Sequence, residues 1–427
     1  MLWNNKVLKN ASWIIVCRIA QMMLNLVVGI LSARYLGPSN YGLINYAASI
    51  ISFISPVMQL GLSNIMVYEL MHNPDDEGEI LGTSMLMSCA SAVLCILGIA
   101  GFTMAMNTGE KETIIVCVLS SIVLLFQAVE LVIYWFQAKL ASKYTSIVMF
   151  CAYVVIASYK IYLLATVKNV YWFAISQTFE QAMVAIGCMT IYRKLGGKRF
   201  SFSLIRAKIL FSRSHHYILS SLMVSIFAQT DRVMIKLMLG SAETGYYSSA
   251  ANCVGLSAFV FAAIIDSMRP TIYENKQKSV EQYENSISLL YCVIIYLSLA
   301  QSAAMTTLAK PIISILYGDS FIPAVSTLRI LVWHTSFSYI GSVRNIWVLA
   351  ENKQKYLLPI NLCGAVANVI LNYVMIPVWG INGAAFASLI TQAFTNIVVS
   401  YLIKPIRHNN RIMVNGLIIS KMIRSRG

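Results

Sequence analysis

The amino-acid sequence predicts an all-α polytopic membrane protein with about twelve transmembrane helices, arranged as two parallel-repeat six-helix lobes around a central cavity. Three observations predict this class: an apolar composition, twelve long apolar stretches, and a motif that recurs at one position in each half. Of the 427 residues, 58% are apolar and only 11% are charged, and the mean hydropathy is +0.69. Such a chain has too little polar surface to cover a water-soluble fold.

Each apolar stretch has the roughly 20 residues that a helix needs to cross a ~30 Å hydrocarbon core at 1.5 Å per residue. Short turns with Gly, Pro and Asn separate the stretches. Within the second stretch, Pro56 removes a backbone hydrogen bond and predicts a kink, with Gly61 close behind it. The predicted spans are residues 12–35, 42–69, 81–106, 113–136, 145–166, 171–193, 217–239, 246–269, 286–307, 325–348, 357–377 and 382–403.

An internal repeat relates the two halves. The pattern Leu36-Gly37-x4-Gly42-x4-Ala47-Ala48 recurs 203 residues later as Leu239-Gly240-x4-Gly245-x4-Ala250-Ala251. Because six predicted spans separate the two copies, both halves have the same orientation in the membrane. This is the arrangement in which two lobes flank a substrate path.

The repeat and the spans divide the chain into four parts. We expect an N-terminal lobe over 1–195, a cytoplasmic linker over 196–216, a C-terminal lobe over 217–404 and a basic cytoplasmic tail over 405–427. Basic residues alternate with apolar ones in the linker and the tail, which favours segments that lie on the lipid surface. A solvated coil is the alternative for both.

The basic residues predict the orientation, because positive charge is retained on the cytoplasmic side. With both termini inside, three basic residues lie outside, at Lys111, Lys168 and Lys310, and eight lie within or at the ends of spans. The net charge of +15 therefore reflects membrane topology, and nucleic-acid binding is not expected. The remaining twenty-one, all in predicted inner segments, are Lys6, Lys9, Lys139, Lys143, Arg193, Lys194, Lys198, Arg199, Arg206, Lys208, Arg213, Lys276, Lys278, Lys353, Lys355, Lys404, Arg407, Arg411, Lys421, Arg424 and Arg426.

Four short motifs, in order along the chain, resemble the polysaccharide-biosynthesis (O-antigen type) flippases of the multidrug/oligosaccharidyl-lipid/polysaccharide exporter superfamily. The resemblance implies a protein of the bacterial inner membrane that moves an undecaprenyl-pyrophosphate-linked oligosaccharide from the cytoplasmic to the periplasmic leaflet. Its implied partners are that lipid and the bilayer, with glycan polymerase or ligase machinery left open. The motifs are Ala33-Arg34-Tyr35-Leu36-Gly37-Pro38-Ser39-Asn40-Tyr41-Gly42, Tyr134-Trp135-Phe136-Gln137-Ala138, Asp231-Arg232-Val233-Met234-Ile235 with Gly245-Tyr246-Tyr247, and Leu316-Tyr317-Gly318-Asp319-Ser320-Phe321.

Charged residues inside the spans agree with such a substrate. A pyrophosphate crossing hydrocarbon needs a wet cationic path, and Arg suits it through its permanent charge and planar donor fork. For each cation the alternative is snorkelling or a structural ion pair, and this alternative is strongest for Lys236 and Arg329, near outer ends, and for Arg269, three residues after Asp266. The candidate substrate-binding residues are Arg18, Lys160, Arg232, Arg269 and Arg344.

Four carboxylates also fall within spans: Glu130, Glu180, Asp231 and Asp266. Each is a candidate coupling group, which binds a proton or cation during transport, or a counter-ion to one of the cations. Adjacent helical residues do not face one another, so we expect Asp231 to reach a partner other than Arg232.

Two other function classes are compatible with twelve spans. A drug or cation antiporter of the same superfamily is expected to have a mainly apolar and acidic interior, whereas seven cations outnumber four carboxylates here. A glycan polymerase is expected to carry a long catalytic outer loop, and these predicted outer turns are short. No phosphate-binding loop or metal-ligand spacing is present, so we expect no enzyme activity, no catalytic residues, no metal and no cofactor.

Overall fold

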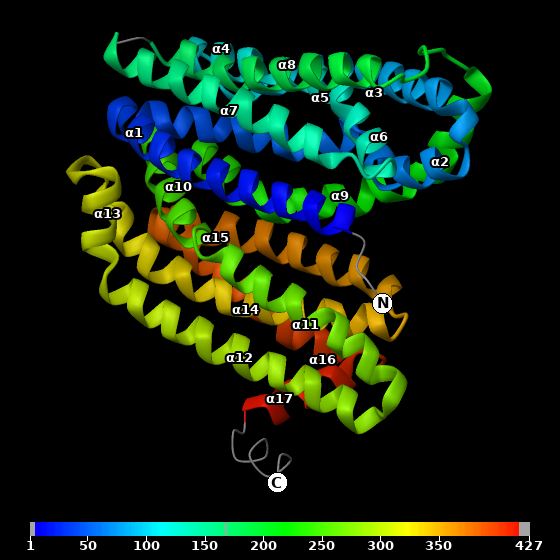
Figure 1. Cartoon of the computed structure of the whole chain (residues 1–427). Helices are drawn as coiled ribbons and strands as arrows, with labels where there is room; N and C mark the ends of the chain where they lie inside the picture. The colour runs from blue at the N-terminus through cyan, green and yellow to red at the C-terminus, as the bar shows by residue number, and fades with distance from the viewer. Residues whose placement is uncertain (1–4, 167–168, 418–427) are drawn as a thin grey trace. The chain divides into compact units, whose positions relative to one another are not determined.

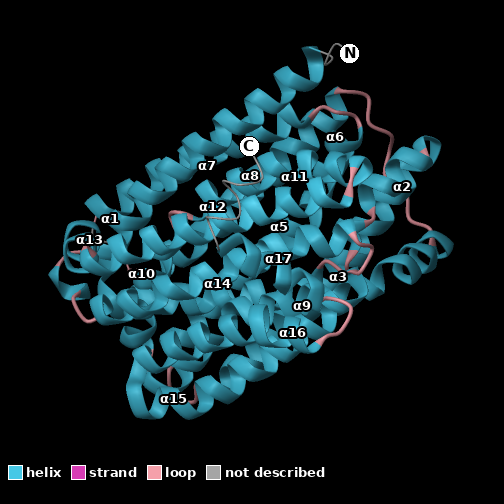
Figure 2. Cartoon of the chain, turned by 90° about the horizontal axis from the view of Figure 1, so that it is seen from below, coloured by secondary structure: helices cyan, strands magenta, loops and turns pink. Residues whose placement is uncertain are grey.

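The computed structural model describes residues 5–166 and 169–417, and it describes side chains from residue 17 onward except at positions 18 and 19. All regular structure in this part of the chain is helical, joined by short loops (Figure 2). The chain divides into two compact units, one up to Ser225 and the other from Ile226 onward. Of the basic residues used to predict orientation, Lys168, Lys421, Arg424 and Arg426 lie outside the described residues.

The N-terminal unit is a set of long helices that pack side by side (Figure 1). Three short 3-10 turns interrupt or join them: η1 (Leu62–Asn64), η2 (Pro74–Asp76) and η3 (Glu130–Val132). The α-helices are α1 (Asn5–Met58), α2 (Met66–His72), α3 (Glu77–Met106), α4 (Lys111–Ser121), α5 (Val123–Val129), α6 (Ile133–Ala138), α7 (Ser142–Ala165), α8 (Val170–Lys194) and the first part of α9 (Leu204–Leu239).

The C-terminal unit begins within α9 and repeats this pattern of long helices and short turns. Its 3-10 turns are η4 (Asp319–Phe321) and η5 (Gln354–Tyr356), and η6 (Phe394–Val399) is a π-helix. The α-helices that follow α9 are α10 (Ser241–Gly255), α11 (Ala258–Lys278), α12 (Val280–Thr307), α13 (Ala309–Tyr317), α14 (Ala324–Ala350), α15 (Leu357–Ala393), α16 (Ser400–Leu402) and α17 (Arg407–Leu417).

The twelve predicted spans fall mainly on helices, although the span predicted over 42–69 crosses the end of α1 at Met58 and the non-helical residues 59–61. Eight helical stretches of the described chain are long and apolar enough to cross a membrane. Two of these, 20–58 and 354–402, each contain two predicted spans that meet at a non-helical glycine, Gly37 or Gly380. The two spans still to be placed are α8 and α14, with 25 and 27 residues. α8 carries Glu180 near its middle, and α14 carries Arg329 and Arg344.

The glycines of the repeated motif have matching backbone conformations. Gly37 has φ 68° and ψ 174°, and Gly240 has φ 105° and ψ −176°. A residue with a Cβ is strained in this region, so glycine allows a sharp turn between two helices at both places. The repeat seen in the sequence is therefore also a repeat of the local structure.

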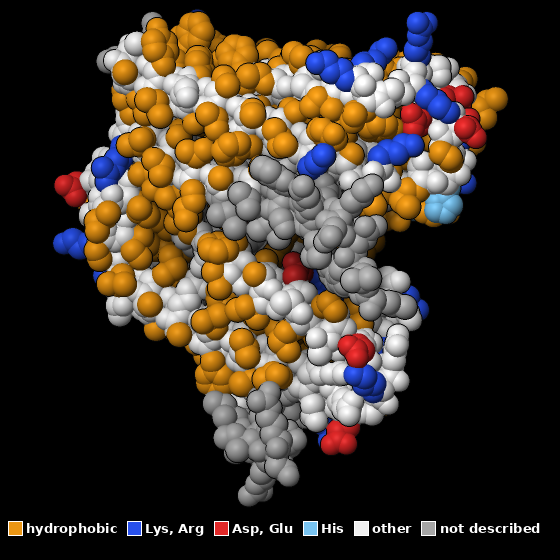
Figure 3. All heavy atoms as spheres, in the orientation of Figure 1, with side chains coloured by type: hydrophobic (Ala, Val, Ile, Leu, Met, Phe, Trp, Pro, Cys, Tyr) orange, Lys and Arg blue, Asp and Glu red, His pale blue; other side chains and the backbone are white. Residues whose placement is uncertain are grey.

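Each unit has its own apolar core. In the N-terminal unit, Met66, Phe136 and Tyr192 are fully buried in one cluster, and in the C-terminal unit Tyr291 and Trp347 belong to another. Figure 3 shows apolar side chains covering the length of the N-terminal unit's helices, with charged side chains gathered at the end that holds α2 and α6. An apolar girdle with charged ends is what a membrane-spanning bundle presents to lipid and water.

The stretch 196–216, expected to be a linker, is split by the structure. Residues 195–203 are not helical and run against α3, whereas α9 already begins at Leu204. A Cβ added at Gly78 or Gly82 of α3 would lie only 2.3 or 2.4 Å from the carbonyl oxygen of Arg199 or Ser201. The segment thus packs tightly on the N-terminal unit, and two glycines make that approach possible.

The described part of the tail forms α17, which packs on α12. Asn409 and Asn410 are buried, and Asn410 donates 3.0 Å to the carbonyl oxygen of Ile397 in η6. This helix therefore presents a polar as well as an apolar face to the protein.

Candidate functional site

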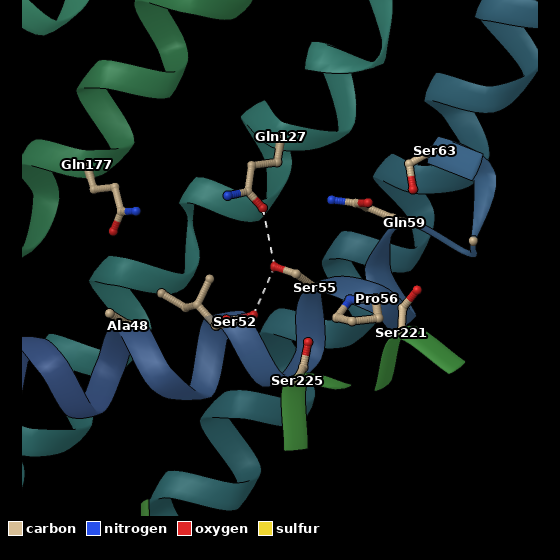
Figure 4. Close-up of a pocket in the computed structure, with 12 residues that line it drawn as sticks. Ala48, Ser52, Ser55, Pro56, Gln59, Ser63, Gln127, Gln177, Ser221 and Ser225 are labelled. Atoms are coloured by element: carbon tan, nitrogen blue, oxygen red, sulfur yellow. Dashed lines mark hydrogen bonds between the residues drawn. The ribbon is translucent and has the colours of Figure 1, made fainter. Parts of the chain in front are cut away.

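A polar pocket of about 350 Å³ lies within the N-terminal unit (Figure 4). Its wall comes from the second half of α1, from η1, and from α5, α8 and α9. Among the side chains that the structure describes, no charged one lines it. The polar side chains of its wall are Ser52, Ser55, Gln59, Ser63, Gln127, Gln177, Ser221 and Ser225.

The end of α1 shapes this pocket. Pro56 lies two residues before the end of the helix at Met58, so the predicted kink becomes a helix end. Ser55 donates to the carbonyl oxygen of Ile51 at 2.9 Å and to Oε1 of Gln127 at 3.5 Å, which ties α1 to α5. Gly61 follows with φ 69°, and a Cβ there would lie 2.3 Å from the carbonyl oxygen of Ser214. Glycine thus lets α9 pass directly beside the pocket.

Three predicted site residues form a charged group in the same unit: Lys160 on α7, Glu180 on α8 and Glu130 in η3. Charge interactions link Glu180 to both Lys160 and Glu130. Glu180 lies near enough to Lys160 for their opposite charges to attract. Glu130 and Glu180 each follow a pocket glutamine by three residues, so they lie one helical turn beyond Gln127 and Gln177.

Asp231, on α9, is the centre of a buried polar network in the C-terminal unit. Its side chain is 8% exposed. Oδ1 accepts hydrogen bonds from Asn372 at 2.6 Å and from Asn368 at 3.2 Å, and Oδ2 accepts from the hydroxyl groups of Tyr247 and Ser388. Four neutral donors from α10 and α15 therefore surround one carboxylate.

Arg232, the next residue, points to different partners. Its guanidinium donates to Oε1 of Gln229 at 3.0 Å and to Oδ1 of Asn252 at 3.3 Å. Its Nε is buried and has no hydrogen-bond partner among the described residues. The expectation that Asp231 reaches partners other than Arg232 agrees with these contacts.

Arg344, on α14, is 3% exposed and contacts the π-helix. Nη1 donates to the carbonyl oxygen of Thr395 at 3.4 Å and to Oγ of Ser400 at 3.0 Å, and Nη2 donates to Oδ1 of Asn345 at 3.1 Å. A π-helix leaves carbonyl groups without their usual helical partners, and Arg344 satisfies one of them. Its Nε has no hydrogen-bond partner in the described structure.

Arg269 and Asp266 form an ion pair on α11, at 2.8 Å and three residues apart. Both side chains are exposed in the structure. Their pairing agrees with the alternative in which each is the counter-ion of the other. The backbone of Arg18 lies in α1, but its side chain lies outside the described residues.

The structure brings the predicted residues together only in part. Lys160, Glu180 and Glu130 form one group in the N-terminal unit, whereas Asp231, Arg232 and Arg344 belong to the other. The neutral polar residues were not predicted as site residues. They are Asn368, Asn372, Ser388 and Tyr247 around Asp231, and the Ser and Gln residues of the pocket. Two spacings in the sequence point to these residues. Asn368 and Asn372 lie four apart in an apolar span, and Ser52, Ser55 and Gln59 recur at the spacing of one helix face. Within the described part of the chain, no group of three or more His, Cys, Asp or Glu residues is placed to hold a metal ion.

Comparisons with known proteins agree with this architecture. A succinoglycan biosynthesis transport protein of Rhizobium meliloti, ExoT, is 22% identical over 328 residues, which cover 76% of this chain and 65% of that protein. The capsular polysaccharide biosynthesis protein CapF of Staphylococcus aureus is 19% identical over 406 residues, covering 93% of this chain and 99% of the relative. The alignment thus spans about two thirds of ExoT but nearly all of CapF.

Two solved structures share the fold. The lipid II flippase MurJ in an inward closed conformation has a TM-score of 0.76 and 14% identity, covering 97% of this chain and 92% of MurJ. An inward-facing multidrug resistance transporter of the MATE family has a TM-score of 0.69 and 15% identity, covering 92% and 95%. These likenesses confirm the predicted all-helical, multi-pass, two-lobe fold. Residues 7–276, more than half of the sequence, match the polysaccharide biosynthesis protein family, and the chain belongs to that family.

Proposed function

We propose that this protein translocates an undecaprenyl-pyrophosphate-linked oligosaccharide from the cytoplasmic to the periplasmic leaflet of a bacterial inner membrane, by alternating access between two lobes. The observation that carries the proposal is the state of Arg232. It is an arginine in a predicted span whose partners Gln229 and Asn252 are both neutral, and its Nε has no hydrogen-bond partner among the described residues. A guanidinium with spare donors inside an apolar helix bundle suits a passing phosphate group.

The other predicted cations have different proposed roles in transport. Lys160 and Arg344 are candidate contacts for the pyrophosphate in other conformations, because in the present one Lys160 interacts with Glu180 and Arg344 is buried against η6. Arg269 is neutralised by Asp266 in this conformation. Arg18 completes the set proposed from the sequence.

Asp231 is the proposed coupling group. A buried carboxylate within a transporter marks a site of proton or cation exchange. The four donors around it are Asn, Tyr and Ser groups, whose oxygen atoms become ligands for a small cation after a rotation. Glu130 is a second candidate for such exchange, whereas Glu180 and Asp266 have cations beside them.

The orientation proposed from charge, with both termini in the cytoplasm, has its own test. Cysteines placed singly at Ser39 and Glu243, in a cysteine-free background, are expected to react with a membrane-impermeant thiol reagent in intact cells. Cysteines at Lys198 and Lys353 are expected to react only after the membrane is broken. Labelling at position 198 from outside would overturn the topology.

Disruption of the gene tests the function itself. A flippase of this kind, when lost, leaves its lipid-linked glycan on the cytoplasmic face, and the expected result is accumulation of that glycan with loss of the exported polysaccharide. A drug or cation antiporter of the same fold, when lost, changes drug or salt sensitivity and leaves the lipid-linked glycan pool unchanged. Normal glycan export in the disrupted strain would exclude the proposed function.

A further inference from the structure

The neutral polar pocket of the N-terminal unit is not explained by pyrophosphate transport alone. We infer that it is a saccharide site, which takes an uncharged sugar residue of the molecule being translocated. This inference rests on the proposed function and deepens it, because it assigns the sugar and the pyrophosphate of one substrate to different side chains.

The chemistry of the pocket wall is the first observation that supports a saccharide site. Its polar groups are serine hydroxyls and glutamine amides, from Ser52, Ser55, Gln59, Gln127 and Gln177 among others. Each of these side chains both donates and accepts hydrogen bonds, as every sugar hydroxyl does. Lys and Arg only donate, and a pocket for pyrophosphate is expected to contain them. None of the Lys and Arg side chains that the structure describes lines this pocket.

The arrangement of these groups is the second observation that supports a saccharide site. Figure 4 shows the side chains of Gln127 on α5, Gln177 on α8 and Gln59 in the turn after α1 extending toward the space between them. Ser221 and Ser225, one turn apart on α9, face the same space from another side. Polar groups that converge from separate helices on one cavity are typical of a ligand site.

The size and the lining of the pocket limit the kind of ligand that it can hold. The volume of about 350 Å³ is near the lower end of the ~300–1,000 Å³ range of small-molecule sites, so it admits a small part of an oligosaccharide at a time. No aromatic ring of the described residues lines the pocket, so the sugar is held by hydrogen bonds to the serine and glutamine groups. Weak binding of this kind suits a cargo that must also leave. A lipid acyl chain would instead offer the serine and glutamine groups no hydrogen bonds.

The pocket wall is also held in place. Ser55 joins α1 to α5 through Gln127, and Gly61 brings the start of η1 against the backbone of α9 at Ser214. A wall fixed by such contacts keeps its hydrogen-bonding groups oriented before the ligand arrives, which lowers the entropic cost of binding.

The test compares two lipids on purified full-length protein in lipid nanodiscs. The first probe is undecaprenyl pyrophosphate, and the second is the undecaprenyl-pyrophosphate-linked oligosaccharide extracted from cells that lack this protein. Wild type is expected to bind the glycosylated lipid more tightly. Gln127→Leu is expected to weaken binding of the glycosylated lipid about tenfold and to leave binding of undecaprenyl pyrophosphate unchanged.

Two further variants keep the test decisive. Gln177→Leu changes an exposed side chain of the pocket and is expected to act like Gln127→Leu even if the latter folds poorly. Gln301→Leu, in the C-terminal unit and outside the pocket, is the matched control and is expected to retain the preference for the glycosylated lipid.

The outcomes separate the inference from the proposed function. Equal binding of the two lipids by wild type, or an equal loss for both lipids in the folded pocket variants, would overturn the saccharide site while leaving the flippase proposal in place. Unchanged binding in both pocket variants would do the same. Failure of wild type to bind either lipid would count against the proposed function itself, and the saccharide site would fall with it.

Discussion

Asn372 donates a 2.6 Å hydrogen bond to the carboxylate of Asp231, which lies 141 residues earlier in the chain. Asn372 also donates to Oδ1 of Asn368 at 3.1 Å, so the two asparagines of α15 and the aspartate of α9 form one linked group. Oδ1 of Asn372 is buried and has no hydrogen-bond donor among the described residues. The network thus contains one charge, several neutral donors and one unused acceptor.

Replacement of Asp231 by Asn tests this group. The variant keeps the shape of the side chain but removes the charge, so we expect transport to be lost while the protein still inserts in the membrane. The measurement is transport in proteoliposomes with and without an imposed proton or sodium gradient. Asp319→Asn, at an exposed position in η4, is the control and should transport normally. A gradient response that survives in Asp231→Asn would show that coupling occurs elsewhere.

Arg344 and Arg18, one in each half of the chain, allow a charge test. Replacement of either by Gln is expected to abolish glycan export without preventing membrane insertion. Lys should restore part of the export, because it keeps a point charge but cannot reach Thr395, Ser400 and Asn345 together as the guanidinium of Arg344 does. Export is measured in cells, with Arg411→Gln on α17 as the control. Normal export by both Gln variants would mean that the pyrophosphate is held by other residues.

Gly61→Ala should destabilise the protein. The new Cβ meets the carbonyl oxygen of Ser214, and the φ of 69° is strained for alanine, so we expect a loss of about 1–3 kcal/mol. Gly98→Ala is the matched control, because Gly98 is helical and has no atom within 4 Å of the added Cβ. Thermal unfolding in detergent measures both. Equal melting temperatures for the two variants would show that α9 does not need this close approach.

Glu77 holds residues 195–203 against the N-terminal unit. It is 5% exposed, accepts from Nε1 of Trp135 at 2.9 Å and from the backbone N–H of Lys198 at 3.3 Å, and pairs with Lys139. Glu77→Ala leaves the buried indole N–H without a partner, at a cost of about 1–3 kcal/mol.

We expect trypsin to cleave near Lys198 faster in Glu77→Ala than in wild type, and the cleavage rate measures how firmly residues 195–203 are held. Glu112→Ala, which removes an exposed carboxylate in the first turn of α4, is the control and is expected to cleave like wild type. A Glu77→Ala protein as resistant as wild type would show that the other contacts of the segment, including those with Gly78, Gly82 and Thr83, hold it without Glu77.

Much of the fold could be predicted because it depends on patterns that are local in the sequence. Apolar stretches of membrane-crossing length marked the helices, and the recurring Leu-Gly turn located Gly37 and Gly240, whose backbones match. The Asp266–Arg269 pair also follows from local spacing, since residues three apart on a helix are neighbours.

The missed features depend on contacts between distant segments. The non-helical stretch after α8 was expected to be a linker on the lipid surface, because nothing local shows that Gly78 and Gly82 leave room for its backbone. Asn368, Asn372 and Ser388 are neutral, so the positions of charged residues within the spans do not identify them. The π-helix at 394–399, which gives Arg344 its carbonyl partner, has no distinct pattern in the sequence.

The central claim is that this protein moves a lipid-linked oligosaccharide between leaflets, and a reconstituted assay tests it most directly. Proteoliposomes are loaded with the glycosylated undecaprenyl pyrophosphate in both leaflets, and periodate, which does not cross the bilayer, oxidises the glycan that faces outside. With wild-type protein, the account predicts that the protected glycan becomes accessible and is consumed, whereas Arg232→Gln leaves it protected as in protein-free liposomes. Glycan that stays protected in the presence of folded wild-type protein, with any imposed ion gradient, would contradict the account.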